Sequence, residues 1–255
     1  MRIVVTGTRG IPDILGGVET HCEELFPRIA RKDIDVTLIR RKSYVHDSLT
    51  EYKGIKLVDL VTPKKKSFEA IIHTFKAILK AKSLHADIVH IHAIGPALVT
   101  PLARLLGMKV VFTHHGPDYD RDKWGFAAKT MLRLGERMGC MFAISEVIND
   151  LLVRKYGRRD CHLIYNGVPA PDKVADTDYL NSLGVEPCKY VFAMGRFVPE
   201  KNFHQLIRAF AALKQQNYKL VLAGDTDFED DYSKKLKSLA KENGVILTGF
   251  IKGTK

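Results

Sequence analysis

Short apolar runs rich in β-branched residues alternate with amphipathic stretches along the first two thirds of the chain. The apolar runs predict strands, and helical spacing of apolar residues predicts helices between them. The predicted strands span residues 3–6, 36–39, 55–58, 87–92, 109–113, 141–145 and 162–165, and the predicted helices 18–30, 67–82, 124–138 and 146–156. Such alternation is typical of an open parallel sheet with helices on both faces, so we predict an α/β fold.

The pattern changes after residue 165. Residues 166–171 are rich in turn formers, and a polar segment continues to Pro187. Alternation then resumes, with strands predicted at 190–194, 219–223 and 245–248 and helices at 203–214 and 232–243. We therefore predict one domain over 1–168, a linker over 169–187 and a second domain over 188–255. Because the second domain has only three predicted strands, we expect it to be incomplete.

Composition and charge narrow the class of protein. The chain has 255 residues, of which 45% are hydrophobic and 27% charged, as in globular proteins. No apolar run approaches a membrane span, no signal peptide is recognised, and the four cysteines form no CxxC pair. These features favour a cytoplasmic protein without disulfides. Residues 1–168 carry 27 basic and 18 acidic residues, and this excess predicts an anionic partner: a phosphate-rich ligand, nucleic acid or an acidic membrane surface.

Two glycine-containing loops are candidate anion sites. The first, TGTRGIPDILGGVET at residues 6–20, places Gly16 and Gly17 directly before a predicted helix, where free N–H groups and the helix dipole attract anions. Its glycine spacing does not fit the dinucleotide-binding fingerprint, and a flexible turn capped by Glu19 is the alternative. The second loop carries Arg196 and Lys201, a planar fork and a compact cation suited to phosphate. Two solvated charges are the alternative there.

Seven motifs occur in an order that identifies a family by resemblance. They are GGVE at 16–19, DIVHIH at 87–92, THHG at 113–116, SE at 145–146, NGV at 166–168, GRFVPEKN at 195–202 and LAGD at 222–225. Together they resemble glycosyltransferase family 4, retaining nucleotide-sugar transferases of the GT-B fold, a pair of Rossmann-like domains with parallel sheets. The opening TGTRGIP with GGVET is similar to a bacterial, rhamnosyltransferase-like subgroup associated with surface polysaccharide assembly.

The resemblance implies roles for particular residues. Residues 1–168 would be the acceptor-side domain and residues 188–255 part of the nucleotide-sugar-binding domain. Gly16 and Gly17 would approach the donor diphosphate, which Arg196 and Lys201 would hold across an interdomain cleft. His115 would lie by the donor sugar and act in catalysis. The nucleotide base is expected near Gly224, Gly249 and Phe250.

Two departures from the family pattern stand out. Tyr165 occupies the place of the proline usual before Asn-Gly-Val. The E-x7-E motif, whose glutamates face the donor, is absent after Lys201, so we expect a truncated C-terminal domain and a fragment that is itself inactive.

No metal or other cofactor is expected beyond the nucleotide-diphosphate sugar, because two cations already neutralise the leaving group. We find no convincing nucleophilic carboxylate, which favours front-face attack by the acceptor. Clustered histidines (His90, His92, His114 and His115) allow a zinc site, but we interpret them as polar residues lining a cleft. Asp-x-Asp pairs at 118/120, 120/122, 176/178 and 225/227 are interpreted as solvated loop charge.

The expected partners are a nucleotide-sugar donor and a saccharide or lipid-linked acceptor, chosen by loops 41–54 and 116–124. Lys64, Lys65 and Lys66 before an amphipathic helix leave open contact with an anionic membrane, peripheral at its inner face. No nucleic-acid-binding module is recognised. The alternatives are an epimerase or phosphorylase of the same architecture, or a non-catalytic nucleotide- or NAD-binding fragment.

Overall fold

The structure is a computed structural model that forms two compact units, Met1–Pro169 and Ala170–Lys255, each described here by itself. It describes residues 1–62, 69–116, 125–139, 141–143, 145–157, 160–168, 170, 176–213, 217–226 and 229–251. Lys64, Lys65 and Lys66, the aspartates at 118, 120, 122 and 227, and part of the predicted linker lie outside the described residues.

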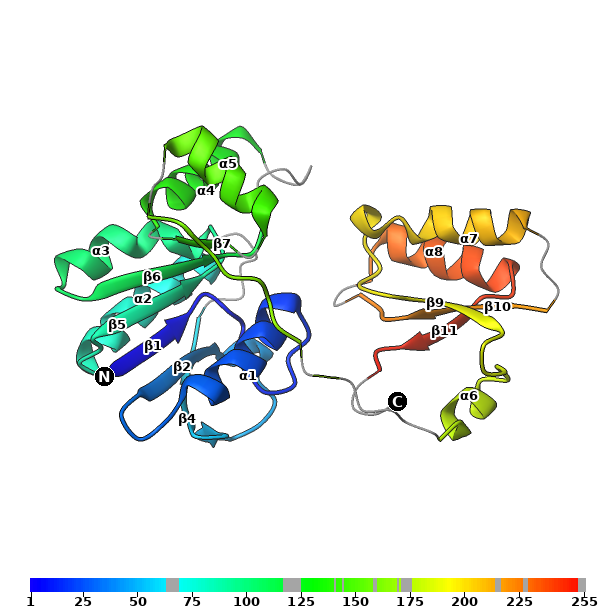
Figure 1. Cartoon of the computed structure of the whole chain (residues 1–255), viewed down its shortest axis with the longest axis horizontal. Helices are drawn as coiled ribbons and strands as arrows, with labels where there is room; N and C mark the ends of the chain where they lie inside the picture. The colour runs from blue at the N-terminus through cyan, green and yellow to red at the C-terminus, as the bar shows by residue number, and fades with distance from the viewer. Residues whose placement is uncertain are drawn as a thin grey trace. The chain divides into compact units, whose positions relative to one another are not determined.

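Unit 1 contains an eight-stranded sheet of order β3-β4-β2-β1-β5-β6-β7-β8, parallel except for β3 (Figure 1). Its strands are β1 (Arg2–Thr6), β2 (Asp35–Arg41), β3 (Glu51–Tyr52), β4 (Ile55–Leu60), β5 (Ile88–His92), β6 (Lys109–His114), β7 (Met141–Ala143) and β8 (His162–Leu163). Because β1 lies between β2 and β5, the strand order reverses there. Ligands of open α/β sheets bind at the carboxyl ends of strands beside such a switch point.

Helices cover both faces of this sheet. They are α1 (Gly17–Ile29), α2 (Glu69–Ser83), α3 (Thr100–Leu105), α4 (Phe126–Met138) and α5 (Glu146–Tyr156), with 3-10 turns at Lys42–Tyr44 and Pro96–Val99. Successive residues of β1 serve the two faces: Val5 packs in the core beneath α1, and Val4 in the core beneath α2, α3 and α5. This alternation follows from the two-residue period of a strand.

Not all described apolar residues of helix α2 are buried. Ala77, Ile78 and Ala81 are fully buried, whereas Phe75 and Leu79 are about half exposed. The helix therefore packs on the core of the sheet through Ala77, Ile78 and Ala81. Among the described residues, no helix is both long and apolar enough to cross a membrane.

Unit 2 contains a parallel sheet of order β11-β10-β9 covered on one face by two helices. Its elements are α6 (Asp178–Ser182), β9 (Tyr190–Met194), a 3-10 turn at Pro199–Lys201, α7 (Phe203–Ala212), β10 (Lys219–Ala223), α8 (Asp231–Glu242) and β11 (Ile246–Gly249). Helix α6 lies inside the predicted linker and was not predicted. Phe192 and Met194 point away from the core and are 51% and 71% exposed.

Candidate functional site

The loop that follows β1 places Gly16 at the N-cap of α1, where no side chain caps the helix. Gly16 has φ +153°, and a Cβ there would lie 2.0 Å from Oε2 of Glu19, so only glycine fits. Nothing lies within 4 Å of a Cβ built on Gly17, which leaves open space over the first turn among the described residues. The open space over Gly17 is compatible with the predicted anion site, which stays a prediction.

Glu19 ties this loop to the helix instead of capping α1. Its buried carboxylate accepts hydrogen bonds from Thr8 Oγ1 at 3.2 Å and the Arg9 N–H at 3.0 Å. The turn is thus fixed by a side chain ten residues away in sequence, and the alternative of a turn in which Glu19 caps the helix does not hold.

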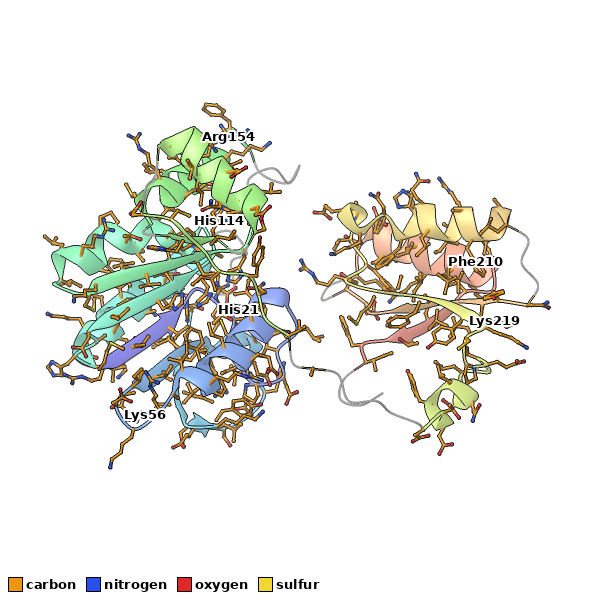
Figure 2. All side chains as sticks on the ribbon, in the orientation of Figure 1. His21, Lys56, His114, Arg154, Phe210 and Lys219 are labelled. Atoms are coloured by element: carbon orange, nitrogen blue, oxygen red, sulfur yellow. The ribbon has the colours of Figure 1, made fainter. Side chains whose placement is uncertain are left out.

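Three imidazoles meet where β5, β6 and α1 converge. His92 ends β5, His115 follows β6, and His92 Nδ1 lies 2.9 Å from His115 Nε2. The ring of His21, from α1, has its centroid 5.2 Å from that of His115 and 5.7 Å from that of His92 (Figure 2 labels His21). His90 stacks on His92 at 4.4 Å. His115, His92 and His90 were predicted from the sequence as residues lining a cleft, whereas His21 was not, although it lies one helical turn after Gly17.

These histidines are electrically neutral near pH 7. Burial, with a smaller effect of neighbouring imidazoles, lowers the pKa of His115 to about 4 and that of His90 to about 3. The same causes hold the pKa of His92 well below its usual range. Burial also lowers the pKa of His21, and a hydrogen bond to Asn166 partly offsets that effect. His115 therefore offers a neutral ring that can exchange hydrogen bonds with a sugar.

A second network fixes the turn on the far side of His115. His114 and Glu136 are fully buried, and His114 Nε2 lies 2.8 Å from Glu136 Oε1. His114 Nδ1 accepts the Gly116 N–H at 3.1 Å, so Nε2 carries the proton that Glu136 accepts. Tyr156 Oη donates to the other carboxylate oxygen at 2.5 Å, and Lys155 Nζ lies 3.3 Å from it. These contacts lower the pKa of Glu136 despite burial, which opposes them.

Tyr165, which departs from the family pattern, has a local role. Ser145 caps α5 by accepting the Ile148 N–H, and the neighbouring Glu146 accepts a hydrogen bond from Tyr165 Oη at 2.8 Å. A pocket of about 260 Å³ opens beside this segment and is lined by residues of α1, His21 among them, and of the stretch 164–168.

In unit 2, the predicted phosphate loop turns back on itself. The Gly195 N–H donates to the Ala223 carbonyl and the Phe197 N–H to the Asp225 carbonyl, both at 3.0 Å. The Pro199–Lys201 turn then returns the chain, so that Lys201 Cδ lies 3.7 Å from a Cβ built on Gly195. Arg196 and Lys201 thus flank one glycine, and neither has an ion-pair partner among the residues that the structure describes.

The glycines predicted near the nucleotide base lie at the same sheet edge. A Cβ on Gly224 would lie 2.0 Å from the Gly195 carbonyl oxygen, and the Gly224 N–H donates to the Gly249 carbonyl at 2.7 Å. Phe250 follows and is 41% exposed. The structure therefore brings the predicted second-unit residues together at the carboxyl ends of β9, β10 and β11. The clasp between Gly16–Gly17 and Arg196–Lys201 joins both units and stays a prediction.

The described aspartates of the Asp-x-Asp pairs serve the local structure. Asp225 Oδ1 lies 2.9 Å from Lys237 Nζ and accepts the Thr226 N–H. Asp176 accepts the Asp178 N–H at the start of α6.

Two units with parallel sheets, each with helices and a candidate site at the strand ends, define the class as GT-B glycosyltransferase fold. Residues 15–170 match the model of Glycosyltransferase Family 4, and residues 179–255 match that of Glycosyl transferases group 1. The chain belongs to glycosyltransferase family 4.

Individual relatives agree with this assignment. The uncharacterized glycosyltransferase YqgM of Bacillus subtilis is 27% identical over 170 residues, 65% of this chain and 47% of that protein. The match therefore spans about half of that relative. The N-acetylgalactosamine-N,N'-diacetylbacillosaminyl-diphospho-undecaprenol 4-alpha-N-acetylgalactosaminyltransferase of Campylobacter jejuni is 30% identical over 96 residues, 36% of this chain and 24% of that one. Anabaena HepE, solved with UDP-glucose, has a TM-score of 0.74 and 19% identity, covering 98% of this chain and 69% of its own.

Proposed function

We propose that this chain binds a nucleotide-diphosphate sugar and forms part of an enzyme that transfers the sugar, with retention, to a saccharide or lipid-linked acceptor in bacterial surface polysaccharide synthesis. One observation carries the proposal: Arg196 and Lys201 flank Gly195 at the carboxyl end of β9, where the Gly195 backbone packs against Gly224 and the Gly224 N–H donates to the Gly249 carbonyl. Two cations beside closely packed glycine backbone suit a diphosphate.

The comparisons support both substrates. The HepE structures contain UDP or UDP-glucose, which favours a nucleotide-sugar donor. The name of the Campylobacter relative gives a sugar carried on diphospho-undecaprenol as its substrate, which favours a lipid-linked acceptor. Such an acceptor would place the enzyme at the inner face of the membrane.

The chemistry follows from the charges. Breaking the bond between the anomeric carbon and the diphosphate leaves the electron pair on the nucleotide, and fixed cations stabilise that charge without a metal. The acceptor hydroxyl attacks from the same face and its proton passes to the departing phosphate, so configuration is retained. The neutral His115 ring orients the donor sugar by hydrogen bonding.

Donor binding tests the proposal directly. Isothermal titration of the chain with UDP, GDP, UDP-glucose, GDP-mannose and NAD should show that a nucleotide diphosphate or its sugar binds and NAD does not. Arg196→Ala and Lys201→Ala should each weaken binding about tenfold or more, because a charge-assisted hydrogen bond contributes roughly 1.5–3 kcal/mol. Lys219→Ala removes the same charge at the amino end of β10 (Figure 2) and should change nothing. Preference for NAD, or equal loss in all three variants, would overturn the proposal.

The reaction itself is tested in the full-length protein. The anomeric configuration of the product, read by NMR, should match that of the donor. Isomerisation of the nucleotide sugar without an acceptor would instead assign the chain to the epimerases.

A further inference from the structure

A cluster of three imidazoles in unit 1 has a geometry that sugar binding does not explain. We propose that His21, His92 and His115 form a binding site for a divalent transition-metal ion, and we assign it to Zn²⁺. This ion would take no part in the transfer step. A catalytic metal ion would instead require carboxylates such as those of the Asp-x-Asp pairs.

The distances suit a zinc ion. One ring nitrogen from each histidine lies within 4.8 Å of the other two, the one such group of three ligand residues among those that the structure describes. Nitrogens bound to tetrahedral zinc at 2.0–2.1 Å lie about 3.3–3.4 Å apart. The 2.9 Å between His92 and His115 and the 4.8 Å limit bracket that value, so small rotations of the rings complete the site.

An unpaired nitrogen of His21 indicates what is lacking. His21 Nε2 is buried and has no hydrogen-bond partner in the described part of the chain, whereas His92 would use the Nδ1 that lies 2.9 Å from His115 Nε2. Buried polar atoms are nearly always paired, so the His21 nitrogen requires an explanation. A ligand set made only of imidazoles selects zinc and its transition-metal neighbours, whereas magnesium and manganese prefer oxygen.

Surrounding residues hold the ligands in place yet leave the site open. His92 is packed between the His90 ring, at 4.4 Å, and the Phe26 ring, at 5.7 Å. His21 lines the pocket of about 260 Å³, which gives an ion a route from solvent. Three protein ligands leave the fourth position to water.

The site has a regulatory consequence that rests on the proposed function. His115 cannot orient the donor sugar while its nitrogen binds zinc, so Zn²⁺ should inhibit transfer competitively with the donor. Binding of the ion itself does not depend on that role.

The test uses the chain without a polyhistidine tag, stripped with EDTA and titrated with Zn²⁺ in a calorimeter. We expect one ion per chain, with affinity at least tenfold weaker in His21→Ala and in His115→Ala. His46→Ala, at an exposed histidine of the same unit, should bind as the parent does. His92→Gln tests the third ligand. Circular dichroism checks that each variant is folded, and His21→Ala remains informative if His92→Gln, at a buried position, does not fold. Absence of stoichiometric binding, or unchanged affinity in folded His21→Ala and His115→Ala, would overturn the site.

A second titration separates the two proposals. If zinc binds but does not weaken nucleotide-sugar binding, the metal site stands and the role of His115 toward the donor is wrong. If zinc does not bind while Arg196→Ala still weakens donor binding, the metal site fails and the proposed function stands.

Discussion

Glu136 shows how one buried side chain can determine the shape of the loop that precedes its own helix. It lies on α4, yet it fixes the ring of His114 at the end of β6, and that ring accepts the Gly116 N–H. Tyr156 and Lys155 of α5 bind the other oxygen of this carboxylate. The His115–Gly116 turn therefore depends on Glu136 through the ring of His114.

Glu136→Ala should destabilise unit 1 by about 3 kcal/mol or more, because removing one partner leaves the other buried groups unpaired. Urea unfolding followed by circular dichroism measures this. The control is Asp150→Ala, which breaks the exposed ion pair with Arg154 on α5 and should cost under about 1 kcal/mol. Equal free energies of unfolding in the two variants would contradict the structural role of Glu136.

Alanine substitutions at Gly224 and Gly244 separate the cost of an unfavourable backbone conformation from the cost of a steric clash. Gly224 and Gly244 both have positive φ, but only at Gly224 would a Cβ meet another atom, the Gly195 carbonyl oxygen at 2.0 Å. Gly244→Ala should cost about 1–2 kcal/mol from backbone conformation alone. Gly224→Ala should cost more and also displace the Arg196 loop. Hydrogen exchange of peptides from β9 to β11 measures both effects, and similar exchange in the two variants would disprove the steric argument.

The sequence could reveal residues whose function lies in a contiguous motif. The loop with Arg196 and Lys201 was predicted from its residue types and its position after a strand, and His115 from the resemblance to the family; both roles stay predictions. Glu136 and His21 were not predicted, and Glu19 was considered only as an alternative cap, since each acts through a contact made only after folding. His114 and Glu136 are 22 positions apart, and no pattern in the sequence pairs them.

At the scale of elements, the carboxyl ends of β5 and β6 carry neutral buried histidines, and this predicts sensitivity to acid. The folded-state pKa is about 3 for His90 and about 4 for His115, below the value of about 6.5 in an unfolded chain. As pH falls below about 6.5, the unfolded state takes up protons first. The stability present above that pH should be lost progressively toward pH 4.

Urea midpoints of unit 1 at about pH 7.5, 6 and 5 measure the effect. His90→Gln should flatten the decline, because glutamine keeps a polar group without titrating. Exposed His46→Ala should leave the profile unchanged. If the urea midpoint stayed constant over this range, burial would not be lowering the pKa of these rings, and the prediction would be wrong.

Most elements were predictable because periodicity is strong where a segment packs on one side. The bounds of β9, β10 and α5 agree with prediction to the residue. Helix α3 was missed because Pro96 and Pro101 interrupt the pattern, although proline is well tolerated in a first helical turn. Strand β3 is two residues long and pairs antiparallel at the sheet edge, too short for any periodic signal.

At the scale of the whole molecule, each unit has its own hydrophobic core. The two cores of unit 1 and the core of unit 2 share no residue. A cavity in one core should therefore loosen its own unit and leave the other protected. Leu222 is fully buried in unit 2, and Leu222→Ala should cost roughly 2–5 kcal/mol there.

Hydrogen exchange distinguishes the outcomes. Amides of β9 to β11 should lose protection in Leu222→Ala, while those of β1, β5 and β6 keep theirs. Phe112→Ala, at a fully buried position in unit 1, should give the reverse. Leu213→Ala, at a leucine that is 65% exposed beyond the end of α7, should alter neither set. Loss of protection in both units from a single cavity would mean that they unfold as one cooperative body. The loop of unit 2 that carries Arg196 and Lys201 would then depend on unit 1 for its shape.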